Sequence, residues 1–349
     1  MPPQAQPLDP AERHELLTAL DRLEERLETA PAGLHAIGGA AEAAALEASN
    51  LPAEAVLLWE KYDGVELVSG EACVFPLAQL ADATARAEEE GLLRPGDIVI
   101  GERGRVLYAL PADPWAEGAS VVSITEENER SPEASSVMRL LLGLLGEVAV
   151  LYDDHGEFHD ALIDEWGDLE QATHRKLLRR RLDFDPIAPG PRLQLARLLL
   201  KSGEQRAAFK EVEKVLHYAP EFAAAHFVRG QTLRGLGKLD QARRAFARGA
   251  EHAYDPVNAA DYEAWAARVA VEAQAANGEE GEAGHAQAHA AAVLRRRPDY
   301  AQNQLLGARA RVQQGDSDAA AELLALGLAV APRNLELLQL RRELEDVEY

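Results

Sequence analysis

The 349-residue sequence contains a single cysteine, Cys73, and only 5% aromatic residues. One thiol can form neither an intrachain disulfide nor a multi-cysteine metal site, so both are excluded within one chain. The most apolar stretch, residues 137–151, is too short for a bilayer and includes two charged side chains. The N-terminus lacks the basic region and apolar run of a signal peptide. These absences predict a soluble, cytoplasmic protein.

Sequence motifs of catalysis are also missing. The chain has no phosphate-binding loop, nucleophile elbow, zinc-protease motif or dinucleotide fingerprint. His155 and His159 stand four residues apart among carboxylates, a spacing that a metal could use on a helix. No third ligand is fixed by the sequence, and a solvated linker explains the two histidines as well. We therefore predict a non-enzymatic protein without a cofactor and leave metal binding at these histidines open.

Positive charge is scarce in the first half of the chain. The net charge of −23 divides into −17 for residues 1–150, −8 for 151–170 and +2 for 171–349. A strongly negative domain repels nucleic acids and anionic membranes and speeds encounter with a basic protein. We predict a basic protein partner and no binding of nucleic acid or membrane. Solubility alone is the competing explanation for the charge.

The second half of the chain is repetitive. Pro220, Pro256, Pro298 and Pro332 end successive segments, at intervals of 36, 42 and 34 residues. Small residues and glycines recur in matching phase within three of these segments. They are Ala196, Gly203 and Ala208 in the first, Gly230, Gly237 and Ala242 in the second, and Gly307, Ala308, Gly315 and Ala320 in the fourth. A small residue near position eight lets two helices approach, and a glycine near position fifteen permits a left-handed turn between them.

In length and phase these segments resemble the tetratricopeptide repeat (TPR) family over about 160 residues. The resemblance implies an all-α, right-handed solenoid over residues 186–349. The third unit departs from the pattern, with a long first helix at 259–276 followed by an extended loop. Residues 334–347, with Leu335, Leu338 and Leu344 among charged positions, predict an amphipathic helix that caps the solenoid.

The first helix of each repeat would line a concave binding surface. The polar candidates on it are Arg197, Lys201, Gln231, Arg234 and Arg309. The positions that some TPR co-chaperones use to clamp a terminal carboxylate carry other residues here, which argues against a chaperone-tail receptor. An apolar floor with scattered arginines suits an amphipathic or acidic peptide. Solvated helix faces are the alternative explanation of these residues.

The first 150 residues predict a mixed fold. Helices are expected at 10–28, from 52 to about 62, and at 77–90, followed by two β-rich runs that meet in a hairpin turn at 101–104. A third strand, ASVVSIT, and a closing apolar helix, SSVMRLLLGLLGEV, follow. This order is typical of an α+β domain.

Four short motifs in this region, together with the hairpin and the final helix, resemble the SUKH superfamily over residues 8–150. The motifs are Leu51-Pro52, Leu58-Trp59, Tyr62-Asp63-Gly64 and Phe75-Pro76-Leu77. The superfamily includes growth regulators and bacterial immunity proteins, and the resemblance implies partner binding through an exposed sheet and loops, without catalysis. The candidate contact residues are Glu88, Glu89 and Glu90 at a helix end and Glu126, Glu127 and Glu129 after the third strand.

The sequence thus predicts a SUKH-like α+β domain at 1–150, a junction at 151–185 and a TPR-like domain at 186–349. The junction is expected to contain a helix from about residue 158 to 181, acidic at its start and basic at its end, as the helix dipole favours. The leading functional hypothesis is an immunity-type protein that neutralises a basic toxin through its acidic domain, with the repeats as a second surface. The alternative is a regulatory scaffold that has no toxin partner.

Overall fold

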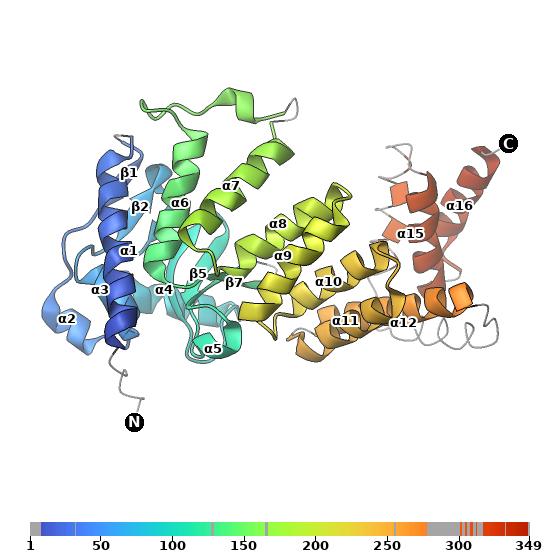
Figure 1. The fold of residues 1–349 in the computed structure, drawn as a ribbon, viewed down its shortest axis with the longest axis horizontal. Coiled ribbons are helices and arrows are strands. Elements are labelled where there is room, and N and C mark those ends of the chain that lie inside the picture. The colour runs from blue at the N-terminus through green and yellow to red at the C-terminus, as the bar shows by residue number, and fades with distance from the viewer. Residues whose placement is uncertain are drawn as a thin grey trace. The chain divides into compact units, whose positions relative to one another are not determined.

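The computed structural model describes residues 8–349 except 32, 127–128, 165–166, 255, 278–300, 302–303, 306–307, 310–311, 313–316, 332 and 348–349. The chain forms two compact units, Met1–Phe222 and Ala223–Tyr349 (Figure 1). This division does not coincide with the boundaries at 150 and 185 that the sequence predicts. Whether residues 1–150 fold on their own stays a prediction.

A seven-stranded antiparallel sheet is the framework of the first unit, and strands that are consecutive in sequence are neighbours in the sheet. The strands are β1 His35–Ile37, β2 Val65–Leu67, β3 Ala72–Val74, β4 Ile98–Arg103, β5 Val106–Leu110, β6 Val121–Ile124 and β7 Arg130–Ala134. The sequence predicts only β4, β5 and β6. The first three strands have three residues each, too few to show an alternating pattern. In β7, Pro132 argues against a strand at the level of sequence, because proline has no N–H group to donate to a neighbouring strand.

The predicted hairpin joins β4 to β5, but its turn is tighter than expected. Gly104, with φ +57°, makes the turn together with Arg105. Gly101, placed in the turn by the sequence, lies within β4 opposite Tyr108, next to a register shift. Its backbone packs closely against that of Cys73 on β3, which leaves no room for a side chain there.

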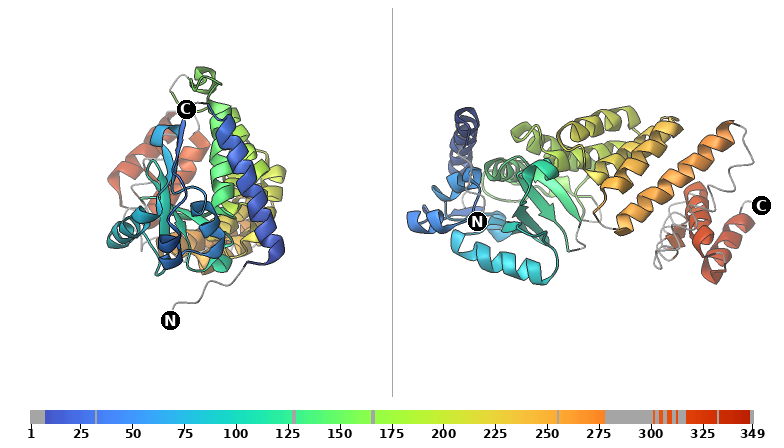
Figure 2. Two further views of the ribbon diagram at one scale, coloured as in Figure 1. Left: turned by 90° about the vertical axis from the view of Figure 1, so that its left-hand side faces the viewer. Right: turned by 90° about the horizontal axis from the view of Figure 1, so that it is seen from below.

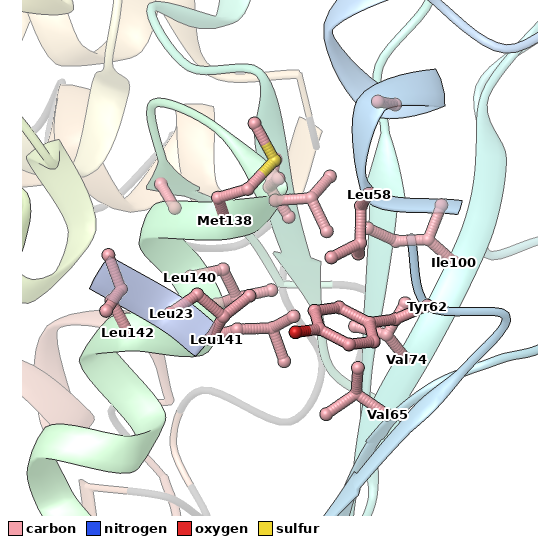
Figure 3. Close-up of a cluster of buried hydrophobic side chains, with 14 of the residues drawn as sticks. Leu23, Leu58, Tyr62, Val65, Val74, Ile100, Met138, Leu140, Leu141 and Leu142 are labelled. Atoms are coloured by element: carbon pink, nitrogen blue, oxygen red, sulfur yellow. The ribbon is translucent and has the colours of Figure 1, made fainter. Parts of the chain in front are cut away.

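Helices cover both faces of the sheet (Figure 2). On one face lie α1 Pro10–Thr29, α3 Ala53–Trp59 and α6 Val137–Leu151, whose leucines pack against the strands in the main core (Figure 3). On the other face lies α4 Leu77–Glu89. Because side chains alternate along a strand, Ile100 enters the first core and its neighbour Val99 packs against α4. Two shorter helices, α2 Ala43–Ala48 and α5 Pro114–Glu117, lie in the connections.

The segment between α6 and the next long helix differs from the sequence prediction. The expected helix from about 158 is wrong at its start: α7 spans Gln171–Phe184, and only one turn of 3-10 helix, Asp160–Leu162, precedes it. The residues before α7 form two turns of one design, eleven residues apart. Each turn begins at an aspartate, Asp153 or Asp164. The backbone N–H of the aspartate donates to the carbonyl of the residue four positions on, and its side chain accepts from the N–H of that residue. A glycine in each turn has a positive φ.

The helices α7, α8 Pro189–Lys201 and α9 Gln205–Tyr218 belong to the first unit. Helix α7 packs on α6, and α8 packs on β7. The contacts are close: a methyl group at Gly190 in α8 would lie 2.5 Å from the carbonyl oxygen of Pro132. At the end of α9, Tyr218 and Ala219 pack against Gly118 behind α5. The first predicted repeat, α8 and α9, is therefore packed onto the sheet.

The second unit contains α10 Ala223–Gly235, α11 Leu239–His252, α12 Pro256–Asn277, α15 Ser317–Val330 and α16 Leu335–Val347. Helix α11 packs against both α10 and α12, and α15 packs against α16. Gly237, with φ +72°, makes the turn between α10 and α11, as the repeat pattern predicts. The second half of the third repeat, and Gly307 and Gly315 of the fourth, lie outside the described residues.

The C-terminal helix is confirmed, with one correction to its buried face. Asn334 caps α16, its Oδ1 accepting hydrogen bonds from the N–H groups of Glu336 and Leu337, each at 3.1 Å. Leu337 and Leu340 are buried against α15. Leu335, expected on the apolar face, is 81% exposed because it begins the helix on the opposite side.

Candidate functional site

Helices α10 and α12 share a face that carries a cluster of aromatic side chains. The ring of Phe227 stacks on Tyr262 at 4.7 Å between centroids and meets Trp265 edge-on at 6.2 Å. Phe246 of α11 is fully buried beneath them and stacks on Trp265 at 5.7 Å. The other three rings are only partly buried. Such offset and edge-to-face contacts stabilise aromatic pairs by about 0.5–1.5 kcal/mol beyond their burial.

Trp265 also lies between two arginines. The guanidinium carbon of Arg268 is 4.8 Å from the Trp265 ring centroid, and that of Arg234 is 5.5 Å away. Both arginines donate to one carboxylate, that of Glu272: the distances are 2.8 and 3.1 Å from Nε of Arg234 and 3.2 Å from Nε of Arg268. We call Phe227, Tyr262, Trp265, Arg234, Arg268 and Glu272 the α10–α12 cluster.

Local sequence explains how the cluster is assembled. A methyl group at Gly230 of α10 would lie 2.7 Å from the Phe246 ring, so only glycine lets α11 bring that ring under the cluster. A methyl group at Gly249 of α11 would lie 3.0 Å from the Tyr262 ring. The two glycines set the distances of α11 from α10 and from α12. Gly230 thus fulfils the role that the repeat pattern predicts for it.

Sequence reasoning found only part of this face. Arg234 lies in the cluster as predicted, and Gln231 is one turn before it on the same helix, partly buried. Tyr262, Trp265, Arg268 and Glu272 were missed, because the long α12 departs from the repeat pattern. The spacing of three and four residues from 265 to 268 and 272 places these side chains on one helical face and could have indicated them.

The other predicted repeat residues do not join the cluster. Arg197 and Lys201 are exposed on α8, in the first unit. Arg309 donates to Glu336 of α16 at 3.0 Å, and both side chains are at least half exposed. These three residues stay predictions as contact sites.

The predicted acidic contacts of the first unit lie in two places. Glu88, Glu89 and Glu90 are exposed at the end of α4. Glu126 and Glu129 are exposed in the β6–β7 connection, where Glu126 pairs with Arg105 at 3.3 Å. Glu127 lies outside the described residues. These carboxylates can meet a cationic partner, but their accessibility is equally that of any solvated surface.

The histidines considered for a metal lie in the first of the two turns, and neither is on an α-helix. The oxygens of Asp153 there accept hydrogen bonds from the N–H groups of His155 and Glu157. The described part of the chain contains no group of three or more His, Cys, Asp or Glu side chains placed to hold a metal ion. Within that same part, no helix is long and apolar enough to cross a membrane.

A buried ion network connects α7 to the sheet. Arg181 of α7 pairs with Glu133 of β7 and, at 3.6 Å, with Glu147 of α6, while Glu147 also accepts from Arg103 of β4 at 2.6 Å. Burial by itself lowers the pKa of the Arg181 guanidinium, but the two carboxylates outweigh it and raise that pKa above its usual value. Burial and the charge of Glu133 raise the pKa of Tyr108 to about 12. Every charge in the network has a partner, which indicates a structural role.

No protein-family model and no curated protein matches the sequence. Among solved structures, the chain is similar to TTC0263, a thermophilic TPR protein of Thermus thermophilus, with 22% identity over 50% of this chain and 89% of that one (TM-score 0.32). It is similar to MamA, with 17% identity over 47% and 91% (TM-score 0.32). It is also similar to YrrB, a TPR protein with an unusual peptide-binding site, with 16% identity over 47% and 97% (TM-score 0.23). The helix pairs of this chain and the glycine turn between α10 and α11 indicate repeats independently of these similarities.

Proposed function

We propose that this protein is a non-enzymatic adaptor that binds another protein through its helical repeats. The observation that carries the proposal is the α10–α12 cluster. Three partly buried aromatic rings and two arginines gather on one face of two neighbouring helices. Trp, Tyr and Arg are the residues most enriched in protein interfaces and in their energetic hot spots. The occupant of this face is a peptide segment of the partner.

Two features support a peptide as the occupant. Aromatic rings whose centroids lie 4.7 to 6.2 Å apart offer a rigid apolar surface, so binding immobilises few side chains on the protein's side. The arginines beside them supply planar donors that fix the orientation of a polar group. In the TPR resemblance, this face belongs to the first helices of successive repeats, the surface on which such arrays bind.

A selection experiment tests this function directly. A phage library of random dodecapeptides is selected against the full chain, and fluorescence anisotropy then measures the affinity of labelled synthetic copies of the enriched peptides. We expect Trp265→Ala to weaken binding at least about tenfold, because loss of a central aromatic contact costs more than about 1.4 kcal/mol. Tyr254→Ala removes a 72% exposed aromatic outside the cluster and should leave the affinity within about twofold.

Circular dichroism of each variant separates lost contacts from lost folding, and Trp265→Phe keeps most of the packing if the alanine variant does not fold. The proposal would be refuted if the selection enriched no peptide, or if the peptides bound both Trp265 variants as tightly as the wild type.

The leading hypothesis from the sequence, neutralisation of a basic toxin by a SUKH-like acidic domain, has no support from the comparisons and becomes the second candidate. Its basis is the charge of −17 over residues 1–150 and the exposed glutamates of the first unit. The same selection discriminates between the two roles. Enriched peptides rich in Lys and Arg, whose binding is lost in a Glu126→Lys, Glu129→Lys double variant and kept in Trp265→Ala, would favour the toxin hypothesis.

A further inference from the structure

The α10–α12 cluster contains one acidic side chain, Glu272, and its other members are aromatic or cationic. We propose that the carboxylate of Glu272 occupies the position that a carboxylate of the partner takes when the partner binds. The face would then select peptides in which Asp or Glu stands beside apolar residues, and Glu272 would compete with them. This inference rests on the proposed function of the same face.

The first support is the chemistry of the ion pairs. Arg234 and Arg268 both donate hydrogen bonds to the carboxylate of Glu272. A guanidinium presents its N–H donors in a planar fork. A guanidinium fork is best matched by a carboxylate. The chemistry assembled here by the chain is therefore that of carboxylate recognition.

The second support is accessibility. The side chains of Arg234 and Glu272 are 30% and 29% exposed, so the pair lies at the surface. A carboxylate arriving from water can reach Arg234, and Glu272 can turn to solvent at a small cost, because ion pairs at such exposure contribute about 1 kcal/mol or less. The exchange leaves both guanidiniums paired. It therefore avoids the large penalty of an uncompensated buried charge.

The third support is the placement of the ions against an aromatic ring. Both guanidiniums are within 6 Å of the Trp265 centroid, and the partly buried rings of Phe227 and Tyr262 continue the surface. A ligand that places a carboxylate on the arginines thus places its neighbouring side chain on aromatic carbon. Residues with an acidic group next to an apolar one fit both parts at once.

The experiment uses the full chain and two labelled peptides. One is an amphipathic dodecapeptide with leucine at every third or fourth position and glutamate elsewhere, and the other has glutamine in place of each glutamate. Fluorescence anisotropy measures both affinities for the wild type, Glu272→Gln and Glu251→Gln. Glu251 is the matched control, since it is a glutamate that pairs with an arginine, Arg248, at 3.1 Å on α11 and is not a member of the cluster.

We expect Glu272→Gln to bind the acidic peptide about three- to tenfold more tightly, which corresponds to about 0.7–1.4 kcal/mol. The glutamine peptide should bind weakly to all three proteins, and Glu251→Gln should behave as the wild type. The proposal is overturned if Glu272→Gln binds the acidic peptide equally or less tightly, if both peptides bind alike, or if the acidic peptide does not bind at millimolar concentration. In those cases phage-selected peptides that depend on Trp265 would still uphold the adaptor, so the two failures are distinguishable.

Discussion

In the first unit, buried charged side chains form ion pairs with residues from distant parts of the chain. Asp97, on the loop before β4, accepts from both terminal nitrogens of Arg130, at 2.7 and 3.3 Å, and from two backbone N–H groups. Arg181 meets Glu133 across 48 positions of sequence. Neither pair could be identified from the sequence, because nothing local indicates which carboxylate meets which arginine. Pairing of this kind makes buried charge tolerable rather than strongly stabilising.

Glu54 is a carboxylate whose surroundings disfavour its charge, and it predicts a measurable pH dependence. Burial is the main cause that raises its pKa, and a hydrogen bond from Ser120 offsets this only in part. The folded state therefore binds this proton more tightly than the unfolded state, so the contribution of Glu54 to stability falls as pH rises from its unfolded pKa through its folded one. Glu54→Gln should remove that fall and stabilise the protein at pH 7.

Urea unfolding at pH 4.5 and pH 7.5 checks this prediction, with Glu60→Gln, on an exposed residue just after the same helix, as the control. A wild type and a Glu54→Gln variant with parallel pH profiles would show that Glu54 titrates alike in both states.

At the level of elements, the packing of α7 on α6 depends on one glycine. A methyl group at Gly146 would lie 2.6 Å from Cε2 of Phe184 and 3.0 Å from Cγ of Arg180. The guanidinium of Arg180 is 4.9 Å from the centroid of the same ring, which holds it in place. One turn earlier, a methyl group at Gly143 would meet its nearest neighbour, Arg181, at the ordinary contact distance of 3.6 Å.

Two glycine-to-alanine variants in one helix should therefore have opposite effects. Gly143→Ala should stabilise the protein by about 0.5–1 kcal/mol, since alanine is the better helix former and meets no obstacle. Gly146→Ala should destabilise it by about 1–3 kcal/mol, because α7 must move or Phe184 must leave its rotamer. Chemical denaturation of both variants measures the difference. Equal effects would mean that α7 is not held against α6 as described.

At the scale of the whole molecule, the first unit extends well past the sheet. Removing residues after 150 would leave Glu133 and Glu147 without Arg181, and it would remove Leu177, whose side chain packs against Val150 at the end of α6. Breaking a buried pair by removing one partner costs about 3–5 kcal/mol. The boundary at 150 is predicted from the charge contrast, from the change from a mixed fold to helices and from the SUKH resemblance. These features reflect composition and local pattern, whereas folding units are set by buried contacts.

Two fragments test where the folding unit ends. We expect residues 1–222 to unfold cooperatively in urea, and residues 1–150 to be less stable by about 3 kcal/mol or more, the cost of breaking the buried pair. Far-ultraviolet circular dichroism and the denaturation midpoint of each fragment provide the measurement. Equal stability of the two fragments would restore the boundary at 150 that the sequence predicts.

Features that depend on local sequence patterns could be predicted from the residues alone. The N-cap and proline at the start of α1, the apolar run of α6, and the glycine phase of α10 and α11 all appear where the residues predict them. Each of these signals acts over a few residues, so backbone geometry and helical periodicity are sufficient to read it. The acidity of the first half of the chain is likewise a property of composition.

Which residues meet was settled by tertiary packing. The three-residue strands depend on tertiary contacts: β2 and β3 are buried in the main core, whereas β1 is mostly exposed and pairs with β2. No period of two can show at that length. The junction became two aspartate-glycine turns instead of a longer helix, because Gly156 and Gly167 adopt positive φ and the aspartates bond to nearby N–H groups. The cluster around Trp265 joins Arg234 to Glu272 across 38 positions of sequence, and its two arginines share one carboxylate because the helices bring them together in space.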